Sequence, residues 1–411
     1  MNTDISLEND RLHIGSFFMA LGTILLCIGY DEALGIANNF TLFAVAILCN
    51  VIEFLTGESQ KIRISPLFVF SIVLIVVLDV IHMAFSPFSR AAVMSIIFYL
   101  VLILSVMLDS YSFRDARVIS DGVIISSIVF TFLTMFLGRE LYPGAGKYVY
   151  VQPFGEHVII EPNYLGALLT LGFCLSVYHL MGPLRVIHSI PAKFFYIVSA
   201  CIILLGIMLT GSRSALVSIF FFAATGIIFM ENSPLKRRLF MLAAAGVTAL
   251  LLMLILGIIP QNVVSRMFNL SSYIDASNMK RVRDWLYGLR MMIRRPLLGS
   301  GPELTQELLM NYFGFSGDAH NTFITAGIMY GLPVLALFVY YIASLTIKAY
   351  RNRDTVMAAI MIAMIFEWNI IACQFTVSTW LTFIICMIMV NTKEVVRESH
   401  TVASGNTGIS A

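Results

Sequence analysis

Charged residues are scarce in this sequence of 411 residues. Asp, Glu, Lys and Arg together make up 12% of the positions, whereas apolar residues make up 59% and the mean hydropathy is +0.87. A water-soluble domain cannot cover its surface with so little charge, so a soluble globular protein is excluded. The net charge of +2 gives no reason to expect nucleic acid as a partner.

Disulfide and zinc-binding patterns are also missing. All six cysteines lie inside apolar runs, and no two of them form a C-x-x-C pair. Neither a disulfide framework nor a zinc site is therefore indicated. The longer polar segments contain no D-x-D or H-E-x-x-H spacing, which are common metal-binding patterns. We expect no metal ion and no cofactor.

Long apolar runs, in contrast, recur along nearly the whole chain. Each is long enough to cross a hydrocarbon core, which takes about 20 helical residues, and no room is left for a separate soluble domain. The sequence predicts an all-α integral membrane protein in which residues 1–411 form one polytopic domain. We expect about twelve transmembrane helices, near residues 14–30, 35–56, 66–85, 91–108, 117–137, 163–182, 192–209, 213–230, 238–259, 320–346, 355–372 and 376–391.

The positions of Lys and Arg predict the orientation of these helices. An even number of crossings puts both termini on one side of the membrane. The loops on that side are short, and each carries at least two positive charges. Because positive charge gathers in short cytoplasmic loops, we expect both termini to be cytoplasmic.

Two loops on the outer side are long enough to have structure. The first, residues 138–162, contains the turn-forming segment Tyr142-Pro-Gly-Ala-Gly146 and ends in Glu161-Pro-Asn163 before a helix. The second, residues 260–319 between the ninth and tenth helices, carries seven Lys and Arg residues against the usual charge bias. These cations favour either an anionic substrate or contact with lipid phosphates.

The larger loop is predicted to contain an amphipathic helix over residues 280–295. Pro296 ends this helix, and a second, shorter helix is expected to start at Pro302. Arg283 and Arg290 share one face with Arg294, where they could bind substrate or rest on lipid headgroups. The apolar residues that recur at helical spacing are Val282, Trp285, Leu289, Met292 and Ile293.

A very short turn, Thr210-Gly-Ser-Arg-Ser214, joins two apolar helices. Arg213 must therefore lie at the outer mouth of a tight helical hairpin, where an unpaired arginine is costly. Its guanidinium either reaches the membrane interface or points into a cavity and holds a phosphate through two parallel hydrogen bonds.

His320 stands at the start of the tenth predicted helix, in the sequence Gly317-Asp-Ala-His-Asn321. A histidine there could act as a general base, with Asp318 orienting its ring. It could also serve only as a cap of the helix.

Four sequence elements occur in a recognisable order. They are Gly-Ser-Arg-Ser at 211–214, Arg281-x-x-x-Trp285, Pro296-Leu-Leu-Gly-x-Gly301 and His320-Asn-x(9)-Gly331. Together they resemble the O-antigen ligase and Wzy-type polysaccharide polymerase superfamily. Glu161-Pro-Asn163 resembles an Asp-Pro-Asn element of the polymerase branch, with Glu in place of Asp. Val334 departs from the ligase pattern, which prefers Gly, Thr or Tyr at that position.

The resemblance implies an enzyme of the bacterial cytoplasmic (inner) membrane that transfers a glycan from undecaprenyl diphosphate to an acceptor hydroxyl at the outer face. In the implied mechanism Arg213 and Arg281 stabilise the leaving diphosphate, and His320 removes the acceptor proton or contacts the phosphate. The further substrate-binding candidates are Arg283, Arg290, Glu161, Asn163, Asp318 and Asn321.

Three functions fit this pattern. The favoured one is a polymerase that joins lipid-linked repeat units into O-antigen, capsule or exopolysaccharide. The alternative is a ligase that moves finished glycan onto lipid A core or protein. The third is a twelve-helix transporter or flippase, but a transporter should show related halves and short outer loops. Expected partners are the undecaprenyl-diphosphate-linked oligosaccharide and the lipid bilayer, and a chain-length regulator is a further candidate; no nucleic acid is expected.

Overall fold

The structure is a computed structural model, and most of the chain is helical in it. The residues it describes are 12–25, 30–31, 36–56, 66–85, 93, 96, 111–141, 143–144, 146–150, 161–181, 190–230, 233–268, 270–313, 319–372 and 378–391. Nearly all of the expected helix at 91–108 lies outside these residues. Asp318 also lies outside them.

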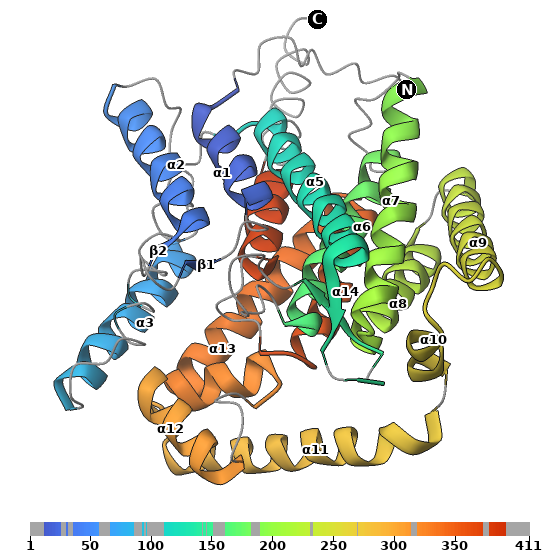
Figure 1. Cartoon of the computed structure of the whole chain (residues 1–411). Helices are drawn as coiled ribbons and strands as arrows, with labels where there is room; N and C mark the ends of the chain where they lie inside the picture. Colours follow the sequence, from blue (N-terminus) through green and yellow to red (C-terminus); the bar gives the residue numbers. More distant parts are fainter. Residues whose placement is uncertain are drawn as a thin grey trace, which may run out of the picture.

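Apolar helices stand side by side, and one long helix, α11, runs across one end of them (Figure 1). We call this end the α11 side. The helices are α1 (Ile14–Ile24), α2 (Asn38–Leu55), α3 (Pro66–Phe85), α5 (Phe113–Leu137), α6 (Pro162–Met181), α7 (Ile190–Thr210), α8 (Arg213–Phe229), α9 (Ser233–Ile255), α10 (Gln261–Phe268), α11 (Leu270–Arg294), α12 (Pro302–Phe313), α13 (Thr322–Arg351), α14 (Thr355–Trp368) and a last helix, Ser378–Asn391.

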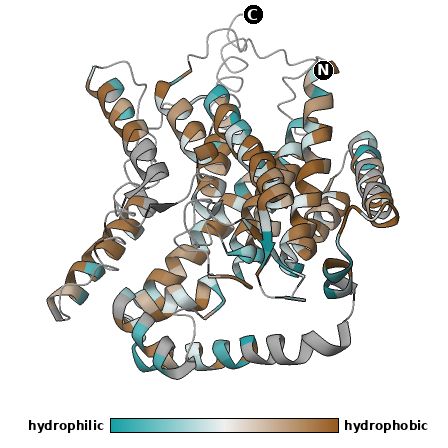
Figure 2. Cartoon of the chain, viewed as in Figure 1, coloured by the Kyte–Doolittle hydropathy of each residue, from teal (hydrophilic) through white to brown (hydrophobic). Residues whose placement is uncertain are grey.

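Several of these helices have the length and composition of membrane spans. Among the described residues five qualify fully, namely α5, α6, α7, α13 and residues Lys236–Ile255 of α9. Shorter apolar helices accompany them, at Ile14–Ile24, Val69–Ala84, Arg213–Phe229, Thr355–Trp368 and Ser378–Asn391. Figure 2 shows apolar residues along the bundle and polar residues in the coloured part of α11. A helical membrane protein is thus confirmed, and the count of twelve spans stays a prediction.

Two short strand pairs depart from the expected all-α fold. β1 (Tyr30–Asp31) pairs antiparallel with β2 (Ile36–Ala37), and β3 (Gly138–Glu140) pairs antiparallel with β4 (Tyr148–Tyr150). The second pair lies in the loop predicted at 138–162. Its formation follows from the turn-forming residues at 142–146, which are followed by the aromatic and β-branched residues that favour strands.

The amphipathic helix of the large loop is longer than the sequence pattern indicated. Helix α11 begins at Leu270 instead of residue 280, and it ends at Arg294 just before Pro296. Residues 270–279 contain neither Gly nor Pro, so no residue there breaks the helix. Short helices α10 and α12 lie on either side of α11 in the sequence, and the placement of residues 260–319 as one outer loop stays a prediction.

Small residues allow the central helices to pack closely. A Cβ atom added at Gly172 of α6 would collide with the hydroxyl of Ser127 in α5, and one at Gly206 of α7 would collide with Thr131. Such close backbone approach is typical of helix packing in membranes, where no hydrophobic effect drives helices together. Helix α6 is buried along most of its length and lies at the centre of the main apolar cluster.

The acidic residues inside the apolar spans face the protein. Asp79 and Glu367 are fully buried. Asp121 of α5 accepts a hydrogen bond of 2.8 Å from the Tyr196 hydroxyl of α7. Turning each carboxylate inward avoids the cost of a lipid-facing charge.

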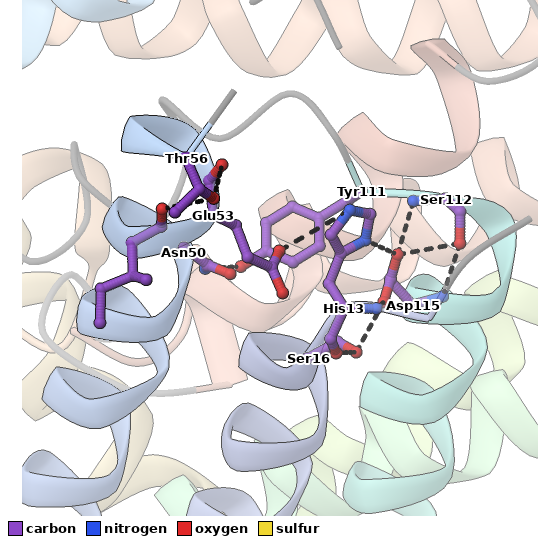
Figure 3. Close-up of polar contacts among 9 residues, drawn as sticks. His13, Ser16, Asn50, Glu53, Thr56, Tyr111, Ser112 and Asp115 are labelled. Atoms are coloured by element: carbon purple, nitrogen blue, oxygen red, sulfur yellow. Dashed lines mark hydrogen bonds and ion pairs between the residues drawn. The ribbon is translucent and has the colours of Figure 1, made fainter. Parts of the chain in front are cut away.

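A polar cluster ties α1 to α5 at the end of the bundle opposite the α11 side (Figure 3). The carboxylate of Asp115 accepts hydrogen bonds from the His13 amide at 2.9 Å and from the Ser16 hydroxyl at 2.7 Å. The Nδ1 atom of His13 lies 2.7 Å from the same carboxylate, and Ser112 forms a capping box with Asp115. These contacts fix where α5 starts.

Helix α13 is broken at Gly331, which has φ +81° and is followed closely by Pro333. Proline has no N–H, so the carbonyl of Met329, four residues before it, loses its helical partner. The carbonyl of Ile328 also loses its partner, because the Leu332 amide donates to the Pro296 carbonyl at 2.7 Å instead. The kink therefore leaves two carbonyls to be satisfied from outside the helix.

The segment Pro296–Gly301 supplies the missing donors. The amide of Ser300 donates to the Ile328 carbonyl at 2.7 Å, and that of Gly301 donates to the Met329 carbonyl at 2.9 Å. Gly299 and Gly301 both have positive φ, of 70° and 75°, which glycine adopts without strain. Two of the four sequence elements, Pro296–Gly301 and the one that ends at Gly331, therefore contact each other and hold the end of α11 against α13.

Candidate functional site

The turn between α7 and α8 places an arginine at the start of a membrane helix. Gly211 has φ +61° and makes the tight reversal, and α8 begins at Arg213. Ser212, the N-cap residue, makes no capping hydrogen bond with its side chain. Within the described part of the chain, the Nε atom of Arg213 is buried and has no hydrogen-bond partner. A buried donor beside a positive helix end is suited to bind an anion.

Buried hydroxyl groups fix the rotation of α8 about its axis. Ser214 donates to one oxygen of Glu367 in α14 at 3.0 Å, and Ser218 donates to the other at 2.7 Å. Because the two serines are one helical turn apart, they hold α8 along one line against α14. Arg213, next to Ser214, is thereby held at a defined position beside α14.

A second arginine binds the same turn from α10. The Nε atom of Arg266 donates to the Gly211 carbonyl at 3.1 Å. A Cβ atom at Gly211 would collide with the carbonyl oxygen of Gly146, in the β3–β4 hairpin. The α7–α8 turn, the start of α10 and the hairpin therefore meet at one place.

The hairpin brings a lysine to this place. The Nζ atom of Lys147 lies 3.9 Å from a carboxylate oxygen of Glu161, and its side chain is 17% exposed. Burial lowers the pKa of Lys147, Glu161 opposes that shift, and the nearby Arg266, Arg281 and Arg213 lower the pKa further. Four cations thus lie within electrostatic reach of each other.

Arg281 on α11 is one of these cations. Its pKa is lowered, first by burial and also by Arg213, while Glu161 and Glu367 act in the opposite direction. Arg213 and Arg281, although far apart in sequence, therefore lie close enough for their charges to act on each other. The structure brings together the two arginines that the sequence singled out.

His320 is held close to the same helix. The indole nitrogen of Trp285 donates to the His320 carbonyl at 3.4 Å. Trp285 follows Arg281 by about one helical turn, so the two residues lie on the same side of α11, about 6 Å apart along its axis. His320 has φ +48°, an uncommon conformation for a residue other than glycine.

Asn321 links this region to α14. Its side chain caps α13 by accepting from the Ile324 amide at 3.0 Å, and it donates to the Asn369 carbonyl at 2.8 Å. Asn369 lies just beyond Glu367, which anchors the start of α8. The contacts run from the Gly-Ser-Arg-Ser turn through α14 to Asn321, so α14 links these two sequence elements.

Glu161 and Asn163 form a small unit at the start of α6. The carboxylate of Glu161 accepts from the Asn163 amide at 3.0 Å and from its side-chain nitrogen at 2.8 Å. Since Glu161 also lies beside Lys147, this unit belongs to the same assembly of residues.

Arg283 and Arg290 are not part of this assembly. Both are exposed, and the helical repeat puts them about 180° around α11 from Arg281. They stand beside exposed apolar side chains such as Leu286 and Leu289. Their position favours contact with lipid headgroups over contact with a ligand beside Arg281.

An apolar cavity lies between α3, α13 and the last helix. Tyr330, Phe338 and Trp380 are among its lining residues, and no charged side chain lines it. Among the described residues no group of three or more His, Cys, Asp or Glu side chains could hold a metal ion. The expectation of a metal-free site stays a prediction.

Two residues of the assembly, Lys147 and Arg266, were not among the sequence-based candidates. Both are basic residues of the two long predicted outer loops, and this charge was the one sequence feature that pointed to them. Charge alone did not separate them from the other cations of those loops. Their place in the site depends on the hairpin and on α10, which bring them to the α7–α8 turn.

Residues 198–339 match the family model described as O-Antigen ligase. This match supports the resemblance of the chain to the O-antigen ligase and Wzy-type superfamily. The matched segment runs from α7 to the kink of α13, and it includes Arg213, Arg266, Arg281 and His320. Lys147, Glu161 and Glu367 lie outside it. Members of this superfamily are membrane glycosyltransferase-like enzymes, and a comparison with curated proteins gave no match.

Proposed function

We propose that this chain is a member of the O-antigen ligase superfamily and a polysaccharide polymerase of the bacterial inner membrane. It transfers a growing glycan from undecaprenyl diphosphate to a sugar hydroxyl of the next lipid-linked repeat unit. In this arrangement the α11 side faces away from the cytoplasm, both termini are cytoplasmic, and twelve helices span the membrane. The polymerase branch is favoured over the ligase branch by Glu161-Pro-Asn163 and by Val334.

One observation carries this proposal, the buried and unpaired Nε of Arg213 beside the start of α8, with Arg281 facing it. A diphosphate leaving group gains negative charge as its bond to the sugar breaks. Fixed arginines in a site that excludes water stabilise that charge without reorganising. Arg213 and Arg281 are placed for this role.

The proposed reaction also needs a base. The acceptor hydroxyl oxygen forms a bond to the anomeric carbon, and the bond from that carbon to the diphosphate oxygen breaks, its electron pair leaving with the diphosphate. The hydroxyl proton passes to His320, which is held one turn along α11 from Arg281. Glu161 and Asn163 are proposed to bind sugar hydroxyls, and Asn321 and Asp318 to position His320.

A deletion strain tests the function. If the protein is a polymerase, its loss should leave single repeat units on the final acceptor, visible as one short species in a gel of the glycan. The ligase alternative, which the family description supports, predicts full-length chains stranded on the lipid carrier. An unchanged glycan profile, with no stranded carrier, would contradict both.

Replacing Arg281 with alanine should slow transfer by roughly 100-fold, because the diphosphate loses one of its fixed donors. Arg281→Lys should recover only part of the rate, since an ammonium group lacks the two-pronged geometry of a guanidinium. The measurement is elongation of lipid-linked repeat units by purified protein. Arg294→Ala, at an exposed position on the same helix, is the matched control and should elongate normally.

A further inference from the structure

The β3–β4 hairpin lies outside the segment that matches the family, yet it is bonded tightly to it. Glu140, at the end of β3, accepts from the amide of Gly146 at 2.6 Å and from that of Gly144 at 3.0 Å. It also accepts from the side-chain nitrogen of Asn262 in α10 at 2.6 Å. These bonds lower the pKa of Glu140, with the Gly146 amide as the largest cause, so the carboxylate is ionised.

The carboxylate of Glu140 therefore bonds both to the tip of its own hairpin and to the first turn of α10. Four residues after Asn262, Arg266 donates to the Gly211 carbonyl. The hairpin touches the same glycine through the carbonyl of Gly146. The three segments form a closed ring of contacts, and the carboxylate of Glu140 bonds to two of them.

This ring of contacts fixes the position of Lys147. It directly follows Gly146, and its own carbonyl accepts from the Leu141 amide at 2.8 Å, which completes the hairpin. Its Nζ faces one carboxylate, that of Glu161, against Arg213, Arg266 and Arg281. A largely buried ammonium group near three guanidinium groups has an excess of positive charge around it, and a doubly charged diphosphate would balance that excess.

We propose that the β3–β4 hairpin is a working part of the site: Lys147 binds the phosphates of the lipid-linked donor, and Glu140 is the positioning residue that holds Lys147 in reach of them. The proposal rests on the proposed function, because it takes a polyprenyl diphosphate as the ligand. Three elements then surround the diphosphate, namely α8 with Arg213, α11 with Arg281 and the hairpin with Lys147.

A binding experiment with purified full-length protein in nanodiscs tests this. The probes are undecaprenyl diphosphate and, for the apolar chain alone, undecaprenol. Lys147→Ala should weaken binding of the diphosphate by about 10- to 100-fold, as expected when a charge-assisted hydrogen bond is lost, and leave undecaprenol binding unchanged. Arg139→Ala is the matched control, since Arg139 is an exposed cation on β3 beside Glu140 and its loss should change neither.

The pH dependence of binding separates a phosphate contact from a merely structural role. The lowered pKa of Lys147 means that its ammonium, and with it the full affinity, is present below that pKa and is lost as the pH rises through it. Lys147→Arg keeps its charge, so its affinity should stay level over the same range. A wild-type protein and a Lys147→Arg variant with the same pH profile would overturn the proposal.

A double-mutant cycle tests the positioning role of Glu140. Glu140→Ala should weaken diphosphate binding in the wild-type background and have no further effect in Lys147→Ala, because its contribution passes through Lys147. Equal losses in both backgrounds would overturn that role. Two further measurements separate this inference from the proposed function, namely the wild-type protein with both probes and Arg213→Ala with the diphosphate. If wild-type protein binds the diphosphate no better than undecaprenol, the proposed function fails. If Arg213→Ala weakens binding while Lys147→Ala matches Arg139→Ala, only the present inference fails.

Discussion

Replacing Arg213 with alanine is expected to reduce polymer formation by about 100- to 1,000-fold, the usual cost of losing one donor to a developing oxyanion. The reason is the geometry at the start of α8, where a buried Nε without a partner lies at the positive end of the helix. The side chain makes no described hydrogen bond that the fold would miss. The measurement is the rate at which purified protein elongates lipid-linked repeat units.

Two further variants make this result decisive. Arg213→Lys keeps the charge and should retain part of the rate, because lysine binds phosphate only as a point charge. Arg237→Ala, at an exposed position near the start of α9, removes an arginine outside the site and should elongate at the wild-type rate. The proposed role of Arg213 is wrong if its alanine variant inserts in the membrane and elongates normally.

Loss of the His320 side chain is expected to slow transfer by roughly 100- to 10,000-fold, the range typical of general-base catalysis. Asparagine is the best replacement, because the backbone at this position has φ +48° and asparagine tolerates that conformation better than alanine does. Single-turnover rates with bound donor are the measurement. Donor affinity should be unchanged, since a base acts on the acceptor.

A glutamine at the same position distinguishes the two roles that remain open for His320. The glutamine amide can donate a hydrogen bond to a phosphate, but it cannot take up a proton. If His320 is the base, His320→Gln should be as slow as His320→Asn. Recovery of the rate in His320→Gln would instead assign His320 to phosphate binding and leave another group as the base.

The main features of the fold follow from local sequence patterns. Apolar runs of about 20 residues can only be buried in lipid as helices, because every backbone group must bond within its own segment. Three helix boundaries also follow from local residues: α8 starts after Gly211, α11 ends before Pro296, and α12 starts at Pro302. The β3–β4 hairpin and the early start of α11 were missed, because turn residues and the absence of helix breakers are weaker signals than an apolar run.

Only some of the residues at the site could be predicted from local sequence patterns. Arg213, Arg281 and His320 stand in motifs whose order could be read along the chain. Arg283 and Arg290 were added because they share charge and helix with Arg281, but the helical repeat turns them away from it. Lys147 was overlooked because its hairpin is distant in sequence from the motifs, and only the contacts of Gly146 and Glu140 bring it there.

The sequence by itself determined that this is a helical membrane protein with a basic loop between apolar helices, because hydropathy and charge act locally and independently of tertiary contacts. Only the tertiary structure decided which cations of that loop face one another. A cation becomes part of a site through burial and through the charges around it, and these depend on how α8, α11, α14 and the hairpin pack. Of the loop's seven cations, Arg281 and Arg266 turn toward Arg213, whereas Arg283 and Arg290 face outward.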